Sequence, residues 1–321
     1  MSLVVRAGIK TVRRRAGAAL MWGFFNGASR LGGLHPAAAP KRHGIERIRD
    51  VPYRDTGMRE HLLDVYRPAG PGPYPVVLYL HGGAFIMLSK ETHWIMGLGF
   101  ARRGFLVFNI NYRLAPQHRY PAAVEDACAA ARWVVQNAHR YGGDASRLVY
   151  AGESAGANLA TTLAIASCYE RPEPWAAALH EIDPSPAAVI AACGVLQVSN
   201  AARFGRRRRL TAFVRDRLEE VPQLYLPTDG SAAPLADPVS FLEAGQTPAR
   251  ALPPFFSFAG TRDPLLDDTR RLARALDKMK VPNEVRYYPG RLHAFHAVVP
   301  DPAARRCWGH QFAFLDRHVP R

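Results

Sequence analysis

Cysteine is scarce in this sequence, with four residues in 321 and no C-x-x-C pair. Small secreted scaffolds need closely spaced cysteines for disulfides, and structural zinc sites need paired ligands, so both classes are excluded. Each cysteine lies in a long apolar stretch, where a free thiol packs as a small hydrophobic residue. We therefore expect four core thiols in a reducing, cytoplasmic compartment: Cys128, Cys168, Cys193 and Cys307.

Long uncharged runs are also missing. The run Ala16–Ser29 is too short to cross a bilayer as a helix, so we predict no transmembrane segment. Hydrophobic residues make up 48% of the chain, and its glycines and prolines follow no period. This composition excludes disordered, collagen-like and coiled-coil proteins and indicates a globular protein with a large core.

The N-terminal region has two interpretations. It has the order of an export signal, with Arg13–Arg15, Ala16–Phe25 and Ala37–Ala39 as charged, apolar and cleavage regions. We favour the alternative, an amphipathic basic helix over Val4–Phe25 that belongs to the folded protein. In that helix we expect three aromatic residues to pack inward: Trp22, Phe24 and Phe25.

Acidic residues are outnumbered by basic ones, 27 against 42, and the formal net charge is +15. The excess is concentrated in residues 1–50 and 201–217, and the rest of the chain is nearly neutral. No Lys/Arg stripe interleaved with aromatic residues accompanies it, so we predict no nucleic-acid partner. We interpret both segments as solvated surfaces. The alternative is weak contact with an anionic membrane surface or an anionic substrate.

Apolar β-rich runs alternate with helical patterns along the chain, which predicts an α/β fold with a mostly parallel sheet covered on both faces. The expected strands are residues 76–80, 105–110, 148–151, 188–192, 255–259 and 284–288. The expected helices are residues 121–138, 155–168, 267–279 and 302–317. Residues 47–53 and 61–66 are separated by turn residues and predict a hairpin before the first parallel strand.

Two stretches depart from this alternation, residues 1–45 and residues 197–250. Long inserts in compact domains are usually lids or binding loops. We expect N-terminal cap helices in 1–45, a cap insertion in 197–250, and a catalytic core formed by 46–196 and 251–321. Both cap segments should cover the carboxyl edge of the sheet, where open α/β folds bind ligands.

The sequence Gly152-Glu153-Ser154-Ala155-Gly156 follows an expected strand and precedes an expected helix. This G-x-S-x-G pattern at a strand-to-helix junction predicts a nucleophile elbow, in which the two glycines avoid clashes in a sharp turn. The turn would expose the hydroxyl of Ser154 at the end of the sheet. Ser154 is therefore the candidate nucleophile.

A second glycine motif, His81-Gly82-Gly83-Ala84-Phe85, follows the expected strand 76–80. Acyl transfer places negative charge on an oxygen, and preorganised backbone N–H groups stabilise that charge. We expect the N–H groups of Gly82, Gly83 and Ala155 to converge as an oxyanion hole.

A serine nucleophile needs a base and an orienting carboxylate. Asp263 follows the strand 255–259, and His293 lies in the loop after the strand 284–288. Asp267 and Asp268 compete with Asp263, but they fall at the start of a helix, where acidic residues act as caps. His296 is the alternative base. The order Ser154, Asp263, His293 is the one expected for this kind of fold.

These motifs together resemble the hormone-sensitive-lipase-like carboxylesterases of the α/β-hydrolase superfamily. The resemblance spans about residues 75–300 and depends on six segments: His81–Phe85, Asn111–Gln117, Tyr120–Ala127, Gly152–Gly156, Asp263–Leu265 and His293–Phe295. It implies an α/β-hydrolase fold in which Ser154 is the nucleophile, His293 the base and Asp263 its orienting partner. It also implies that Gly82, Gly83 and Ala155 are the oxyanion donors and that His81 supports their loop. Ala84 stands where the family usually has Gly, and Glu153 stands where Asp is commoner.

We therefore predict a serine carboxylesterase that hydrolyses small to medium acyl esters without a cofactor. An amidase or formamidase on the same scaffold and a ligand receptor without catalysis are the alternatives. We predict no metal, because His293, His296 and His310 lack companion ligands at a zinc spacing. The strand 284–288 is a candidate sheet edge, which would allow a homodimer.

Several polar residues have structural explanations. Glu125 and Asp126 are expected to pair with Arg113 or a helix end rather than to catalyse. Three residues after the glycine loop either line the pocket or only pack in the core: Met87, His93 and Trp94.

Overall fold

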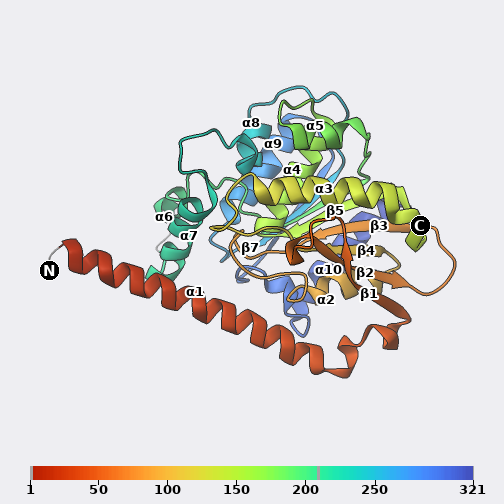
Figure 1. The fold of residues 1–321 in the computed structure, drawn as a ribbon, viewed down its shortest axis with the longest axis horizontal. Coiled ribbons are helices and arrows are strands. Elements are labelled where there is room, and N and C mark those ends of the chain that lie inside the picture. The colour runs from red at the N-terminus through yellow and green to blue at the C-terminus, as the bar shows by residue number, and fades with distance from the viewer. Residues whose placement is uncertain (1–2, 208–209, 321) are drawn as a thin grey trace.

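The computed structural model describes residues 3–207 and 210–320, so Arg208 and Arg209 of the predicted basic insertion lie outside the described residues. Eight strands form one twisted sheet in the order β1-β2-β4-β3-β5-β6-β7-β8 (Figure 1). Their bounds are β1 Ile45–Pro52, β2 Leu62–Pro68, β3 Tyr74–Leu80, β4 Leu106–Ile110, β5 Gly143–Glu153, β6 Ala188–Ala192, β7 Phe255–Gly260 and β8 Asn283–Tyr288. The strands β3 to β8 run parallel, and β2 is antiparallel to both β1 and β4.

The predicted strands and the predicted hairpin are all present. The central strands β4 and β6 are buried at every position. Their uninterrupted apolar runs predicted this, because a strand covered on both faces has no solvent-exposed side. The hairpin is the β1–β2 pair, and β8 is an edge strand of the sheet.

Helices cover both faces of the sheet. The α-helices have the bounds α1 Leu3–Leu34, α2 Trp94–Ala101, α3 Ala122–Asn137, α4 Ala155–Cys168, α5 Pro174–Glu181, α6 Arg203–Arg207, α7 Ala212–Tyr225, α8 Pro238–Glu243, α9 Leu266–Lys278 and α10 Pro302–His318. One apolar core joins the sheet to α3, α4, α5 and α8, and a second joins its other face to α2 and α10. Every residue of α4 is buried, because its Ala, Gly and Thr side chains allow close approach to β5 and β6.

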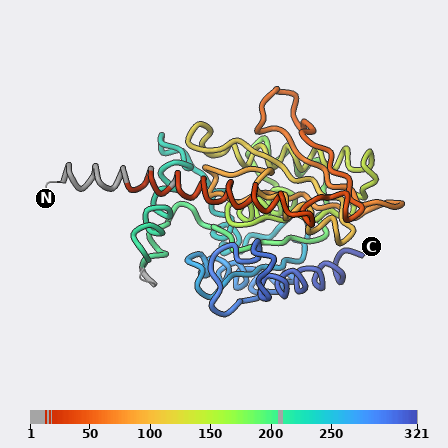
Figure 2. The backbone as a smooth tube through the Cα atoms, turned by 90° about the horizontal axis from the view of Figure 1, so that it is seen from below, coloured from red at the N-terminus to blue at the C-terminus, as the bar shows by residue number. Residues whose placement is uncertain are grey.

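The two stretches predicted to be cap segments contain α1, α6, α7 and α8. Figure 1 shows α1 along one side of the molecule next to α7, and Figure 2 shows it crossing in front of the body. Arg13 of α1 pairs with Asp216 of α7, and Arg14 pairs with Glu219. The helices of the second predicted cap stretch pack in two directions, since α7 contacts α1 while α8 packs against α9 and α4.

The N-terminal helix exists but buries a different face from the one predicted. It extends over Leu3–Leu34, well beyond Phe25. The prediction that its aromatic residues pack inward was wrong, since Trp22 is 55% exposed, Phe24 69% and Phe25 36%. Its inward contacts are made by Gly17 and Ser29 instead. None of the described helices is long and apolar enough to cross a membrane.

Candidate active site

Ser154 lies between the end of β5 and the start of α4, with φ 55° and ψ −111°. A non-glycine residue adopts this conformation only at a cost, and such strain is concentrated at functional sites. The Ser154 N–H donates to the carbonyl of Ala192 at 2.8 Å, which ties the turn to the end of β6. A Cβ atom at Gly152 would lie 2.2 Å from the carbonyl oxygen of Gly156, so the predicted reason for the first glycine of the elbow is confirmed.

Asp263 and His293 meet at the carboxyl ends of β7 and β8. His293 Nδ1 lies 2.9 Å from Asp263 Oδ2, and the Leu265 N–H donates to the other carboxylate oxygen at 2.8 Å. The Asp263 side chain is fully buried, so its charge acts through a poorly screened environment. Burial alone would lower the pKa of His293, but the adjacent Asp263 carboxylate raises this pKa well above 6.5.

The competing candidates are engaged elsewhere. Asp268 accepts hydrogen bonds from the N–H groups of Leu196 and Gln197 and pairs with Arg203. His296 Nε2 lies 3.3 Å from Glu153 Oε2 on the other side of the elbow. The structure therefore pairs Asp263 with His293, whereas Asp268 and His296 have other partners.

The backbone after β7 holds the two loops together. The Arg262 N–H donates to the carbonyl of Arg291 at 2.9 Å, and the Gly290 N–H donates to Thr261 Oγ1 at 2.8 Å. A Cβ atom at Gly260 would lie 2.1 Å from the Arg291 carbonyl oxygen, so only glycine allows this approach. Gly260 was missed as a site residue, because its partner loop is thirty residues away in the sequence.

Cys193 was correctly predicted to be buried, but its position next to the imidazole was not foreseen. Its Sγ, a carboxylate oxygen of Asp263 and a ring nitrogen of His293 all lie within 4.8 Å of one another. Among the described residues, these three are the side chains of metal-binding type whose ligand atoms lie this close together. Asp263 and His293 already form a hydrogen bond with each other. Its position directly after β6, at the carboxyl edge of the sheet, was the available signal.

The loop after β3 presents its backbone toward the elbow. Gly83 has φ +117°, and a Cβ there would lie 1.9 Å from the Met87 carbonyl oxygen. Ala84 also has a positive φ, +56°, which explains why Gly is the favourable residue at this position. Within the described residues, the N–H groups of Gly83, Ala84 and Ala155 donate no backbone hydrogen bond.

Gly82 is the predicted oxyanion donor whose N–H has a partner in the structure. It donates to His93 Nε2 at 3.2 Å, so the role of Gly82 as an oxyanion donor stays a prediction. Ala84 is a further candidate donor, beside Gly83 and Ala155. The direction of a backbone N–H depends on the φ and ψ of the loop, which the glycine motif alone does not determine.

His81 lies at the start of this loop and is buried. Its Nδ1 donates to the carbonyl of Gly82 at 2.6 Å, and its ring stacks on Tyr112 with centroids 4.2 Å apart. Burial lowers the pKa of His81 to about 3, so the ring stays neutral. These contacts agree with the predicted supporting role.

Glu153 joins the loop to the elbow from behind. His93 Nε2 lies 3.6 Å from Glu153 Oε1, on the opposite side of the carboxylate from His296. Burial would raise the pKa of Glu153, but the imidazoles of His93 and His296 hold it at about 2. His93 is therefore a site residue that contacts both the oxyanion loop and the residue before Ser154.

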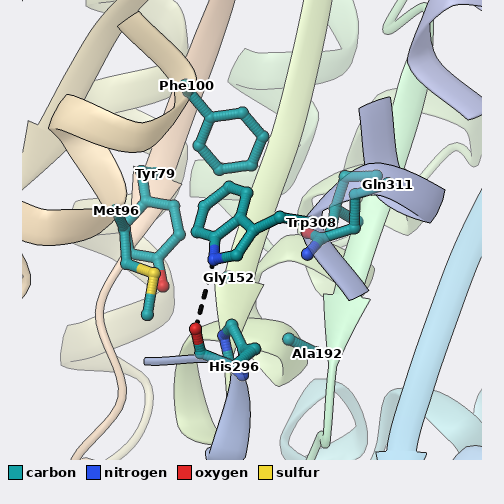
Figure 3. Close-up of a pocket in the computed structure, with 9 residues that line it drawn as sticks. Tyr79, Met96, Phe100, Gly152, Ala192, His296, Trp308 and Gln311 are labelled. Carbon is teal, nitrogen blue, oxygen red and sulfur yellow. Dashed lines mark hydrogen bonds between the residues drawn. The ribbon is translucent and has the colours of Figure 1, made fainter. Parts of the chain in front are cut away.

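A small cavity of about 10 Å³ lies behind the elbow, lined by residues that include Gly152, Ala192 and His296 (Figure 3). The Trp308 Nε1–H donates to the His296 carbonyl at 3.1 Å across its wall. The cavity holds at most about one water molecule. It is too small for an ester.

The remaining polar candidates have structural partners. Arg113 pairs with Glu125 and Asp126, as predicted. Met87 is buried, and Trp94 packs on α1 through Ser29.

Comparison with known protein families shows which family this chain belongs to. The alpha/beta hydrolase fold family matches residues 77–297. This protein belongs to that family. An acetyl esterase of Salmonella dublin is 31% identical over 251 residues, covering 76% of this chain and 71% of the relative.

Solved structures agree with this membership. The esterase LipW from Mycobacterium marinum has a TM-score of 0.76 and 29% identity, covering 95% of this chain and 90% of its own. An esterase from the bacterial hormone-sensitive lipase family has a TM-score of 0.67 and 28% identity, covering 86% of this chain and 85% of its own. The predicted fold and the predicted resemblance to the hormone-sensitive-lipase-like family are confirmed.

Proposed function

We propose that this α/β hydrolase is a serine carboxylesterase for small to medium acyl esters. Ser154 is the nucleophile, His293 the general base, and Asp263 the carboxylate that orients His293. The observation that carries the proposal is the 2.9 Å contact between His293 Nδ1 and the buried Asp263 carboxylate, at the same edge of the sheet as the strained Ser154 turn. Relatives and structural neighbours named acetyl esterase and esterase support ester hydrolysis.

The reaction follows from the order of these groups. His293 removes the Ser154 proton as the hydroxyl oxygen attacks the ester carbonyl. Asp263 holds the imidazole with Nδ1–H toward itself, which leaves Nε2 as the proton acceptor, and it stabilises the imidazolium that forms. The alcohol leaves with the proton from His293, and water then attacks the acyl-enzyme by the same route.

The negative oxygen of the tetrahedral intermediate needs donors that are not already engaged. The N–H groups of Gly83, Ala84 and Ala155 meet this requirement, whereas that of Gly82 is bonded to His93. Ala155 also begins α4, so the N-terminal end of a fully buried helix adds positive potential at the same place. Such preorganised donors contribute about 3 kcal/mol each to lowering the barrier.

The decisive test is hydrolysis of p-nitrophenyl acetate by purified protein. Ser154→Ala should lower kcat by about 10⁴-fold or more while the protein remains folded by circular dichroism. Asp263→Asn should lower it by a comparable factor, because an amide favours the wrong imidazole tautomer. Substantial turnover by Ser154→Ala would refute the proposal.

Substrate class is tested with two series. Matched ester and anilide substrates separate a carboxylesterase from an amidase, and faster anilide cleavage would favour the amidase. A p-nitrophenyl series from acetate to palmitate should show its highest kcat/KM at short to medium chains. A wild-type protein that binds esters but turns over none of them would instead be a ligand receptor.

A further inference from the structure

The outer face of α1 is apolar and uncovered. Four large side chains on this helix are each 69–79% exposed: Leu20, Phe24, Leu31 and Leu34. Their spacing of four, seven and three residues places them on one side of a helix with 3.6 residues per turn. We name these four residues the α1 stripe. Side chains of this size exposed together on one face indicate an interaction surface.

The C-terminal half of the α1 stripe faces away from the body because the opposite side of the helix is anchored there. Ser29 Oγ donates to the carbonyl of Glu91, and Trp94 Nε1 donates to Ser29 Oγ at 3.1 Å. The Trp94 ring also lies within 4.0 Å of where Cβ atoms would stand at Gly32 and Gly33. At 3.6 residues per turn, positions 29, 32 and 33 lie on the side of the helix opposite the stripe. Figures 1 and 2 show the helix on the outside of the molecule.

The charged residues of the N-terminal segment that carries the stripe are all basic. Residues 1–45 contain eight Lys and Arg and no acidic residue. Among the described residues, no acidic side chain forms an ion pair with the exposed Arg30, Lys41 or Arg42. In α7, Asp216 and Glu219 face Arg13 and Arg14, so the neighbouring acids already pair with basic residues. An apolar stripe beside unpaired cations is the pattern of a helix that lies in the interface of an anionic membrane.

We propose that the α1 stripe docks this protein on an anionic lipid surface, with Leu20, Phe24, Leu31 and Leu34 inserted among the acyl chains. Arg30, Lys41 and Arg42 then contact lipid phosphate or carboxylate groups. No described helix can span a bilayer, so the contact is peripheral.

A second copy of the chain fits this surface less well. The stripe approximates a heptad seam, but its central position is Gly27, which has no side chain to pack into a partner. Two α1 helices side by side would also bring two cationic segments within a Debye length, with no acidic residues in either helix to offset the repulsion. An anionic lipid surface satisfies both the apolar stripe and the charge.

Vesicle cosedimentation of the full-length protein tests this proposal. The wild type should pellet with vesicles of phosphatidylcholine containing about 30% phosphatidylglycerol and remain in the supernatant with phosphatidylcholine alone. Raising NaCl from about 0.1 to about 0.5 M should weaken binding to the anionic vesicles, because screening shortens the range of the charges. A wild type that stays in the supernatant with anionic vesicles overturns the proposal.

Two sets of variants distinguish vesicle binding through the α1 stripe from binding driven by net charge alone. The variant Leu20→Gln, Phe24→Gln, Leu31→Gln, Leu34→Gln keeps helix-forming residues and should bind about tenfold or more weakly. Arg30→Gln with Lys41→Gln and Arg42→Gln should also lose binding. Its matched control removes the same charge from exposed sites outside the cap: Arg102→Gln, Lys278→Gln and Lys280→Gln. Equal loss in both triple variants would mean that net charge, and not this surface, drives binding.

Two controls complete the design. Turnover of soluble p-nitrophenyl acetate by the four-Gln variant should equal that of the wild type, which shows that the core is folded. Ser154→Ala should still bind vesicles, so failure of the esterase proposal leaves this test intact. A wild type that forms dimers in analytical ultracentrifugation, with the four-Gln variant monomeric and neither binding vesicles, would assign the stripe to self-association and refute lipid docking.

Discussion

Gly260 and Arg291 approach so closely that a Cβ on the first would lie 2.1 Å from the carbonyl oxygen of the second. This contact holds the loop with His293 against the loop with Asp263, because the Arg262 N–H donates to the same carbonyl. The position of the imidazole therefore depends on a glycine that takes no part in the chemistry.

Gly260→Ala should displace the Arg291 carbonyl and with it His293. A shift of about 1 Å between catalytic groups costs about 10²-fold in rate, so kcat/KM for p-nitrophenyl acetate should fall by about that factor. Gly309→Ala is the matched control, since no atom lies within 4 Å of the new Cβ in α10. Equal activity of the two variants would show that the loop does not depend on this contact.

The pH dependence of turnover should reflect the raised pKa of His293. Only the neutral imidazole accepts the Ser154 proton, so activity is present above this pKa and is lost as the pH falls through it. Because the Asp263 carboxylate outweighs burial, the acidic limb of kcat/KM should have its midpoint above 6.5. A midpoint at or below 6.5 in a pH series with a non-ionising ester would contradict the assignment.

Much of the fold could be predicted because its signals are local. Alternating apolar and helical runs indicated the strands and helices, and Gly152 and Gly156 marked the elbow through the space that their missing side chains leave. The partners Asp263 and His293 could be proposed because carboxyl ends of neighbouring parallel strands meet at one edge of a sheet.

The parts that could not be predicted depend on contacts between distant segments. The direction of the Gly82 N–H is decided by His93, eleven residues further on and across the loop. The position of Cys193 beside His293 depends on how the ends of three strands align. The spacing in α1 indicated a helix, but not which face the body covers, because that is decided by Trp94 and α7.

Glu153 should stabilise the protein in a pH-dependent way. Its folded pKa of about 2 is lower than 4.5, so its contribution is fully present above pH 4.5 and is lost as the pH falls through 2. A difference of this size corresponds to about 3 kcal/mol. The unfolding free energy of Glu153→Gln in urea should therefore lie below that of the wild type at pH 6, with the gap closing toward pH 2. A gap that does not change with pH would exclude this account.

Gly83 should tolerate no side chain, whereas Ala84 should tolerate the loss of one. Gly83→Ala combines an unfavourable positive φ with a Cβ placed 1.9 Å from the Met87 carbonyl oxygen, so the oxyanion loop must move. We expect a loss of kcat of about 10²-fold or more, the cost of removing one oxyanion donor. Gly57→Ala has the same kind of backbone strain at φ +70° but meets no atom within 4 Å, and it should keep full activity. Ala84→Gly relieves strain at φ +56° and should keep activity within about threefold while raising Tm by a few degrees. If Gly83→Ala were as active as Gly57→Ala, the loop after β3 would not supply the oxyanion donors.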